Sequence, residues 1–83
     1  MSDIQEIGKL LDNLIAFLEE ENDEHWLSWF RQSKQYLDNS DGRAINHVLQ
    51  AYGSMGSFSD AYLMELTSQI YDLASKIKKE HDL

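Results

Sequence analysis

Residues 4–18 read IQEIGKLLDNLIAFL, and the spacing of their apolar side chains decides the fold class. Five side chains recur at alternating steps of three and four, and three more widen the row: Ile4, Ile7, Leu11, Leu14 and Leu18, with Leu10, Ile15 and Phe17. Because an α-helix turns once in 3.6 residues, such a row forms one apolar face. The sequence therefore predicts an amphipathic helix from residue 3 to about residue 19.

A second helix is expected to begin within the acidic run Glu19–Glu24, with Asn22 or Asp23 as its cap and the acids near its favourable amino end. It should end near residues 38–42, DNSDG, because all five are turn formers. Large apolar side chains are concentrated in this segment: Trp26, Leu27, Trp29, Phe30, Tyr36 and Leu37.

Two further helices are predicted, and no segment shows the alternation of a strand. The third is short, starts at Gly42 or Arg43, and carries Ala44, Ile45, Val48, Leu49 and Tyr52. The fourth runs from Asp60 to about Lys79 behind a cap at Ser57 or Ser59. Its expected buried row is Tyr62, Leu63, Leu66, Ile70, Leu73, Ala74 and Ile77. We predict an all-α fold, a small antiparallel bundle of about four helices, in a single domain over residues 1–83.

Composition limits the classes of protein that this chain can represent. Hydrophobic residues make up 42% of the 83 residues, and proline and cysteine are absent. That content supports one core, and it excludes disulfides, thiolate zinc sites and cysteine nucleophiles. The start MSDIQE lacks the basic and apolar parts of a signal peptide, and no apolar run approaches the ~20 residues of a membrane span. We expect a cytoplasmic protein without membrane contact.

The formal net charge of −8 argues against nucleic acid as a partner, because a phosphate backbone would be repelled. The charge is also uneven along the chain. Residues 1–24 carry eight acids against Lys9, whereas Lys76, Lys78 and Lys79 lie together near the other end. A partner recognised by charge is therefore expected to be a basic protein.

Residue patterns for catalysis or metal binding are weak. None of His25, His47 and His81 lies three or four residues from another, so no helical metal pair exists. The 38–42 run resembles a calcium loop, but its glycine comes one position early and Leu49 stands where a bidentate glutamate is needed. No acid lies inside an apolar row, where burial would tune it for acid–base work. We therefore predict no enzyme activity, no metal and no cofactor.

The most distinctive segment is YGSMGSFSD, residues 52–60. Its two glycines permit backbone angles that other residues avoid, yet it lacks the lysine of a phosphate-binding loop. Two interpretations stay open: a tight interhelical connection with Met55 and Phe58 in the core, or a contact surface for a partner or ligand. A second open question is whether Trp29 or Tyr36 fills the core or anchors an interface. The candidate binding residues are Trp29, Tyr52, Gly53, Met55, Gly56, Ser57, Phe58 and Asp60.

With Trp26 or Trp29 ahead of it, this segment resembles a family of short uncharacterised bacterial proteins. In that family a tryptophan-bearing helix precedes a YGGMGS-like loop and an aspartate. The resemblance covers roughly residues 10–66, and Ser54 departs from its glycine. It implies no activity. In size and charge the chain is similar to toxin-neutralising immunity proteins, which is an analogy.

The leading hypothesis for function is a non-catalytic protein-binding module, in the form of an immunity-type inhibitor of a basic partner. Its acidic N-terminal region and the 53–60 loop would make the contact. One alternative is a structural homodimer closed through an uncovered aromatic face. Another is a small-ligand binder that uses Tyr52, Ser57 and Asp60.

Overall fold

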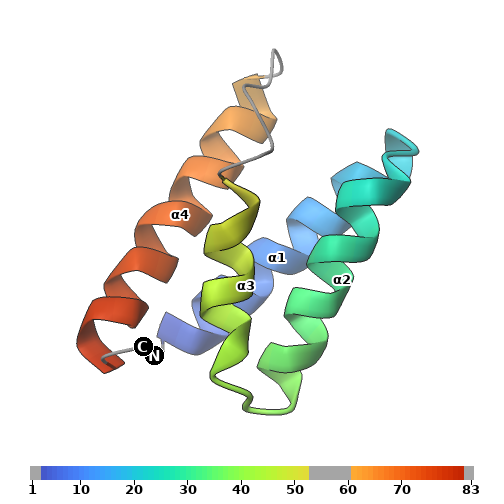
Figure 1. The fold of residues 1–83 in the computed structure, drawn as a ribbon. Helices are drawn as coiled ribbons and strands as arrows, with labels where there is room; N and C mark the ends of the chain where they lie inside the picture. The colour runs from blue at the N-terminus through green and yellow to red at the C-terminus, as the bar shows by residue number, and fades with distance from the viewer. Residues whose placement is uncertain (1–2, 53–60, 82–83) are drawn as a thin grey trace.

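Four helices make up most of the chain that the computed structural model describes, residues 3–52 and 61–81 (Figure 1). They are α1 (Asp3–Glu20), α2 (Glu24–Asp38), α3 (Arg43–Ala51) and α4 (Ala61–His81). The predicted all-α bundle with one short helix is confirmed, and the short helix is α3. Within the described ranges no strand is present.

The four helices form a ring in which each packs against two neighbours. Helix α1 packs against α2 and α4, and α3 packs against the same two helices. Among the described residues, no Cα atoms of the diagonal pairs, α1 with α3 and α2 with α4, lie within 8 Å of each other. Successive helices run antiparallel, so the α1–α2 turn lies at the same end as the end of α3 and the start of α4 (Figure 1). The chain termini and the α2–α3 connection lie at the opposite end.

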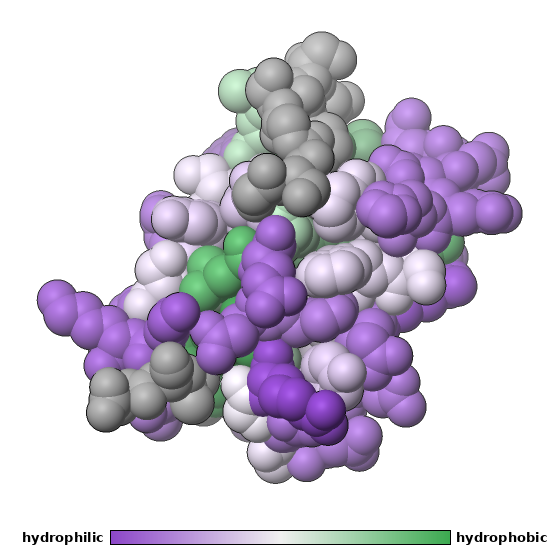
Figure 2. All heavy atoms as spheres, viewed as in Figure 1, coloured by the Kyte–Doolittle hydropathy of each residue, from purple (hydrophilic) through white to green (hydrophobic). Residues whose placement is uncertain are grey.

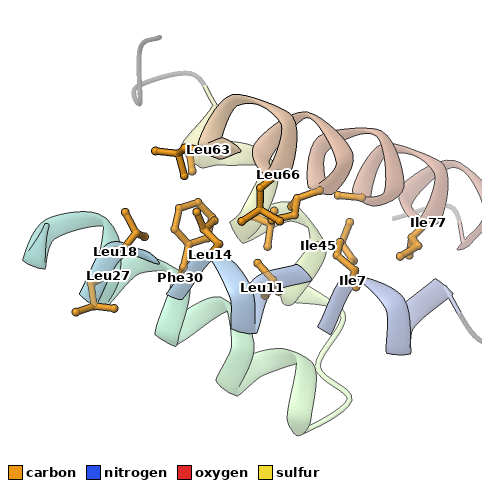
Figure 3. Packing of buried hydrophobic residues seen from close by; sticks show 14 residues of the cluster. Ile7, Leu11, Leu14, Leu18, Leu27, Phe30, Ile45, Leu63, Leu66 and Ile77 are labelled. Carbon is orange, nitrogen blue, oxygen red and sulfur yellow. The ribbon is translucent and has the colours of Figure 1, made fainter. Parts of the chain in front are cut away.

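The interior of the ring is a single apolar cluster to which all four helices contribute (Figure 3). Its most completely buried large side chains come from every helix: Ile7, Leu11 and Leu14, Phe30, Val48, and Ile70 and Ile77. Burial of one such side chain stabilises a fold by about 1.5–3 kcal/mol, so this cluster is the dominant favourable contribution. The apolar rows predicted for α1, α3 and α4 are confirmed at most of their positions.

Two side chains of the predicted rows are exposed. Tyr62 keeps 54% of its surface, so its prediction as a buried residue was wrong. It precedes Leu63 by one residue, which rotates it by about 100° from the core direction and turns it toward α1. Ile4 is 36% exposed because it lies in the first turn of α1, at the open end of the bundle.

The α1–α2 turn closes with a left-handed residue, Asn22, at φ 58°. Its amide donates to the carbonyl of Glu19 at 3.3 Å, and the amide of Asp23 donates to that of Leu18 at 3.1 Å. This pair of bonds satisfies two of the last carbonyls of α1. The Asp23 side chain then accepts from the amide of Trp26 at 3.4 Å and caps α2. Of the two predicted caps, Asp23 is therefore the cap of α2, and Asn22 ends α1.

The end of α2 repeats this device at Ser40, whose φ is 56°. The Ser40 amide donates to the carbonyl of Leu37 at 3.0 Å, and the Asp41 amide donates to that of Tyr36 at 2.8 Å. The predicted stop near residues 38–42 is thus confirmed. The caps predicted for α4, Ser57 and Ser59, lie outside the described residues.

Replacing Ser40 by glycine should stabilise the fold. Holding a residue with a Cβ in the left-handed region costs about 1–2 kcal/mol, and glycine avoids this cost. Glycine loses more backbone entropy on folding, but that loss offsets only part of the gain. We expect Ser40→Gly to raise the free energy of unfolding by about 0.5–1 kcal/mol, measured by urea denaturation. The matched control is Ser28→Gly, on the exposed side of α2, which should lower it. Equal destabilisation by both variants would contradict the role given to the Ser40 backbone.

Candidate functional site

Acidic side chains gather at the α1–α2 turn: Glu19, Glu20, Glu21, Asp23 and Glu24. All but Asp23 are exposed, and Glu19 pairs with Arg31 at 3.0 Å. Within residues 3–52 and 61–81, the other four form no ion pair. Only Asp23 and Glu24 lie at the favourable amino end of α2. Glu19 and Glu20 belong to the carboxyl end of α1 and Glu21 follows it directly, where the helix dipole disfavours negative charge, so the expectation for these three was wrong.

The basic residues of α4 lie at the opposite end of the bundle. Lys76 pairs with Asp3 at 3.2 Å and lies 3.9 Å from Glu80, whereas Lys78 and Lys79 have no ion pair among the described residues. The 18 residues of α1 separate the two ends by about 27 Å. That distance exceeds the screening length of about 8 Å at physiological salt. The lysines of α4 therefore do not neutralise the acidic turn, and they share their own end of the bundle with the acids Asp3, Glu6, Asp38, Asp41 and Glu80, so that end has mixed charge. Figure 2 shows the hydrophilic atoms of the α1–α2 turn.

Large apolar side chains remain exposed along α4: Tyr62 at 54%, Met64 at 51% and Tyr71 at 46%. Tyr62 and Met64 lie in its first turns, at the acidic end. The Tyr62 ring contacts Phe17 of α1, with centroids 5.8 Å apart. Tyr71 lies on the other flank, edge-on to Tyr52 at 5.0 Å. On the face viewed in Figure 2, hydrophobic atoms also show between α3 and α4.

Trp29, one of the predicted contact residues, lies in the seam between α2 and α3. Its indole stacks on the His47 ring at 4.1 Å and 12°, and its N–H donates to the His47 carbonyl at 2.9 Å. Tyr36 meets the same imidazole edge-on, and the Arg43 guanidinium lies 4.7 Å above the Tyr36 ring. Trp29 is half-buried, and its polar atom is satisfied within the bundle. It holds two helices together and offers only part of its ring to a partner.

Ser33 and His47 form a polar pair that the sequence did not reveal. The Ser33 Oγ lies 2.6 Å from His47 Nδ1 and 3.2 Å from the Trp29 carbonyl. The Ser33 hydroxyl has one proton, so two arrangements are possible. In one, the hydroxyl donates to the Trp29 carbonyl and accepts from Nδ1–H of His47; in the other, it donates to Nδ1. A serine beside a histidine has the composition of an activated nucleophile. Ser33 is completely buried, however, so no substrate reaches its oxygen in this structure.

Tyr52, the second predicted contact residue that is described, joins the end of α3 to α4. Its hydroxyl donates to the Thr67 carbonyl at 2.7 Å. Burial raises the pKa of this hydroxyl well above its usual range, and the charge of Asp72 adds to the effect. Tyr52 and Trp29 therefore lie on opposite flanks of α3. The other predicted contact residues lie outside the described residues: Gly53, Met55, Gly56, Ser57, Phe58 and Asp60.

A cavity of about 250 Å³ opens at the end that holds the chain termini. It is lined by Ile4, Leu37, Ser40, Asp41, Gly42, Ala44, Ile45, Ile77 and His81. This volume is below the roughly 300–1,000 Å³ of small-molecule sites. The described residues contain no group of three side chains suited to hold a metal ion, and no helix among them is long and apolar enough to cross a membrane.

The fold and its surfaces define a small four-helix protein with one acidic end, exposed side chains on α4 and aromatic contacts in its seams. Residues 19–72, 54 of the 83, match the family described as a domain of unknown function (DUF6966), and the chain belongs to this family. The expected membership of an uncharacterised family is confirmed. The match covers the acidic turn, α2, α3 and the first half of α4. No curated protein and no solved structure matches the chain.

Because the His47 ring is partly buried, we predict that the stability of the folded chain depends on pH. Burial lowers the pKa of His47 below its ordinary value of 6.5, so the folded chain binds a proton less readily than the unfolded chain. The stability that the neutral His47 ring contributes is fully present above pH 6.5, and it is lost as the pH falls toward the pKa of His47 in the folded chain. We expect the free energy of unfolding to fall between about pH 7.5 and about pH 5.5, above the range in which carboxylates titrate.

Urea denaturation at a series of pH values measures this loss. His47→Gln should show a shallower pH dependence over the same range, whatever its stability at neutral pH. His25→Gln, on the exposed first turn of α2, is the matched control and should keep the dependence of the parent chain. An unchanged slope in His47→Gln would refute the assignment.

Proposed function

We propose that the chain is a non-catalytic protein-binding module whose partner is basic. The observation that carries the proposal is the separation of charge, with unpaired acids at the α1–α2 turn and lysines about 27 Å away. A one-sign end of this kind attracts an oppositely charged partner and raises its rate of encounter. The proposal also places the chain in a bacterial cytoplasm, which cell fractionation tests. By analogy in size and charge, an immunity-type inhibitor is the form that this function takes.

The position of the acids supports a role outside folding. Glu19 and Glu20 end α1 and Glu21 follows it directly, at a helix end where cations are favoured and each acid costs about 0.3–1 kcal/mol at an exposed site. Only Glu19 gains an ion pair in return, with Arg31. Residues that lower stability without a local benefit are a common mark of functional surfaces.

Exposed apolar side chains beside these acids support the same proposal. Tyr62 and Met64 expose about half of their surfaces in the first turns of α4, and Tyr62 contacts Phe17, two residues before the acidic run. Aromatic side chains with acidic neighbours match the anatomy of a binding surface, in which the apolar centre supplies residence time. The burial of Ser33 supports binding over catalysis, because the one serine–histidine pair of the described residues is closed to substrate.

A homodimer is the second candidate. Tyr71 is 46% exposed on the flank of α4 that faces away from Tyr62, so a second apolar area is available for self-association. A mass that rises with concentration would favour this candidate.

The test of the basic partner is affinity capture of the tagged chain from its native cell lysate at low and high salt, with mass spectrometry of the eluate. We expect a basic protein that is retained at low salt and lost at high salt. The double variant Glu20→Lys/Glu21→Lys should lose this protein and also melt at a higher temperature, because it places cations at the end of α1.

The matched control is Asp72→Lys/Glu80→Lys, which makes the same change in net charge on exposed positions of α4. It should retain the partner, since it leaves the α1–α2 turn intact. Capture that is independent of salt, or that is equally weakened by both double variants, would overturn the role of the acidic end.

A further inference from the structure

The outer edge of the seam between α1 and α4 has a fixed register. Asp3 pairs with Lys76 at 3.2 Å near one end, and Phe17 contacts Tyr62 at 5.8 Å near the other. The residue numbers of both pairs add to 79, so the antiparallel register is constant between them. Leu10 therefore lies across from Gln69, and Glu6 lies across from Leu73. This edge spans residues 3–17 of α1, about 21 Å or four helical turns.

Apolar surface runs along this edge. Leu10, Phe17 and Leu73 are half-buried, and each packs its inner side against the core cluster. Tyr62 leaves more than half of its surface in solvent beside Phe17. These side chains come from two helices that pack against each other and lie as a strip along one edge, with exposed Gln69 across from Leu10.

The charges that border the strip are mostly negative. Glu6 of α1 and Glu65 of α4 are exposed, and neither has an ion pair within residues 3–52 and 61–81. Glu65 accepts a hydrogen bond from its neighbour Gln69 at 3.4 Å. The one base on this edge, Lys76, lies between Asp3 and Glu80. The strip is therefore apolar in the middle and acidic at its rim.

We propose that the α1–α4 strip, formed by Leu10, Phe17, Tyr62 and Leu73 between Glu6 and Glu65, docks a basic amphipathic helix of the partner. The proposal rests on the proposed function and names the element of the partner that is bound. A helix fits because the seam of two antiparallel helices accepts the apolar row of a third, and its length holds about four turns. The described residues offer no sheet edge for strand addition. Lysine and arginine on the helix flanks would reach the two glutamates.

The probe is a fluorescent 18-residue peptide, about five turns, of leucine and lysine with leucines at the three-four spacing of an amphipathic helix. Its counterpart carries glutamate in place of lysine. We expect the lysine peptide to bind, measured by fluorescence anisotropy, and the glutamate peptide not to bind. Amide hydrogen exchange should show added protection along α1 and α4.

Two tyrosine variants locate the contact. Tyr62→Ser removes the exposed ring of the strip and should weaken binding about tenfold or more, as an anchor residue does. Tyr71→Ser removes a ring of similar exposure from the other flank of α4 and should leave affinity within about twofold. Thermal melting by circular dichroism checks that both variants remain folded.

Three results would overturn the docking site, and each is distinct from failure of the proposed function. In one, the lysine peptide binds with equal affinity to both tyrosine variants. In another, the peptide does not bind the parent chain. In the third, sedimentation shows that the parent chain is a dimer and that Tyr62→Ser is a monomer, which would mean that the strip binds a second copy of the chain. Capture from lysate decides the basic partner separately, because it requires no peptide and responds to the charge of the α1–α2 turn.

Discussion

The ring of four helices around one narrow core is the constraint on which the rest of the structure depends. Each helix meets only two neighbours, so each devotes one row of side chains to the core and two flanks to seams. In α1 that row is Ile7, Leu11, Leu14 and Leu18, and its shared burial fixes the rotation of the helix. Every other side chain of α1 therefore lies in a seam or faces solvent. The candidate binding surfaces are made of these side chains.

The seams differ in what closes them. The α1–α2 seam carries ion pairs such as Lys34 with Asp12 at 3.2 Å. The α2–α3 seam is closed by the stack of Trp29 on His47 and by the buried Ser33 hydroxyl, and the α3–α4 seam by the bond from Tyr52 to Thr67. The α1–α4 seam carries one ion pair at its end, Asp3 with Lys76 at 3.2 Å, and presents apolar side chains outward along the rest of its edge. We place docking along this apolar part, since a stretch already filled by its own polar contacts has little to offer a partner.

The parts of the fold that depend on local periodicity could be predicted from sequence, and the parts that depend on the rotation of one helix against another could not. The apolar rows of α1 and α3 repeat within a few residues, so the sequence alone predicts them. The pairing of Ser33 with His47 joins residues 14 apart on different helices and leaves no local pattern. The prediction for Tyr62 is wrong because this residue lies at the margin of its row, where a small rotation of the helix decides between core and solvent.

The candidate site was harder to predict for a related reason. An aromatic side chain has the same sequence signature whether it closes a seam or anchors a partner, and Trp29 and Tyr52 proved to hold seams. The acidic run is predicted to surround the start of α2, although a boundary at Glu20 places Glu19 and Glu20 on α1 and Glu21 directly after it. A shift of two or three residues thus reverses the sign of the helix-dipole contribution. Six further candidates lie outside the described residues.

Attraction between charges and contact between apolar groups act over different distances, and this chain offers both at one end. The acidic turn acts within a screening length of about 8–10 Å, so the lysines at the far end of α4 do not neutralise it. The Phe17–Tyr62 contact lies on the same end, two residues from Glu19. A basic helix drawn to the turn would arrive at the head of the α1–α4 strip. Encounter and docking would then need no reorientation of the partner, which is the arrangement that converts a charge-driven on-rate into a lasting complex.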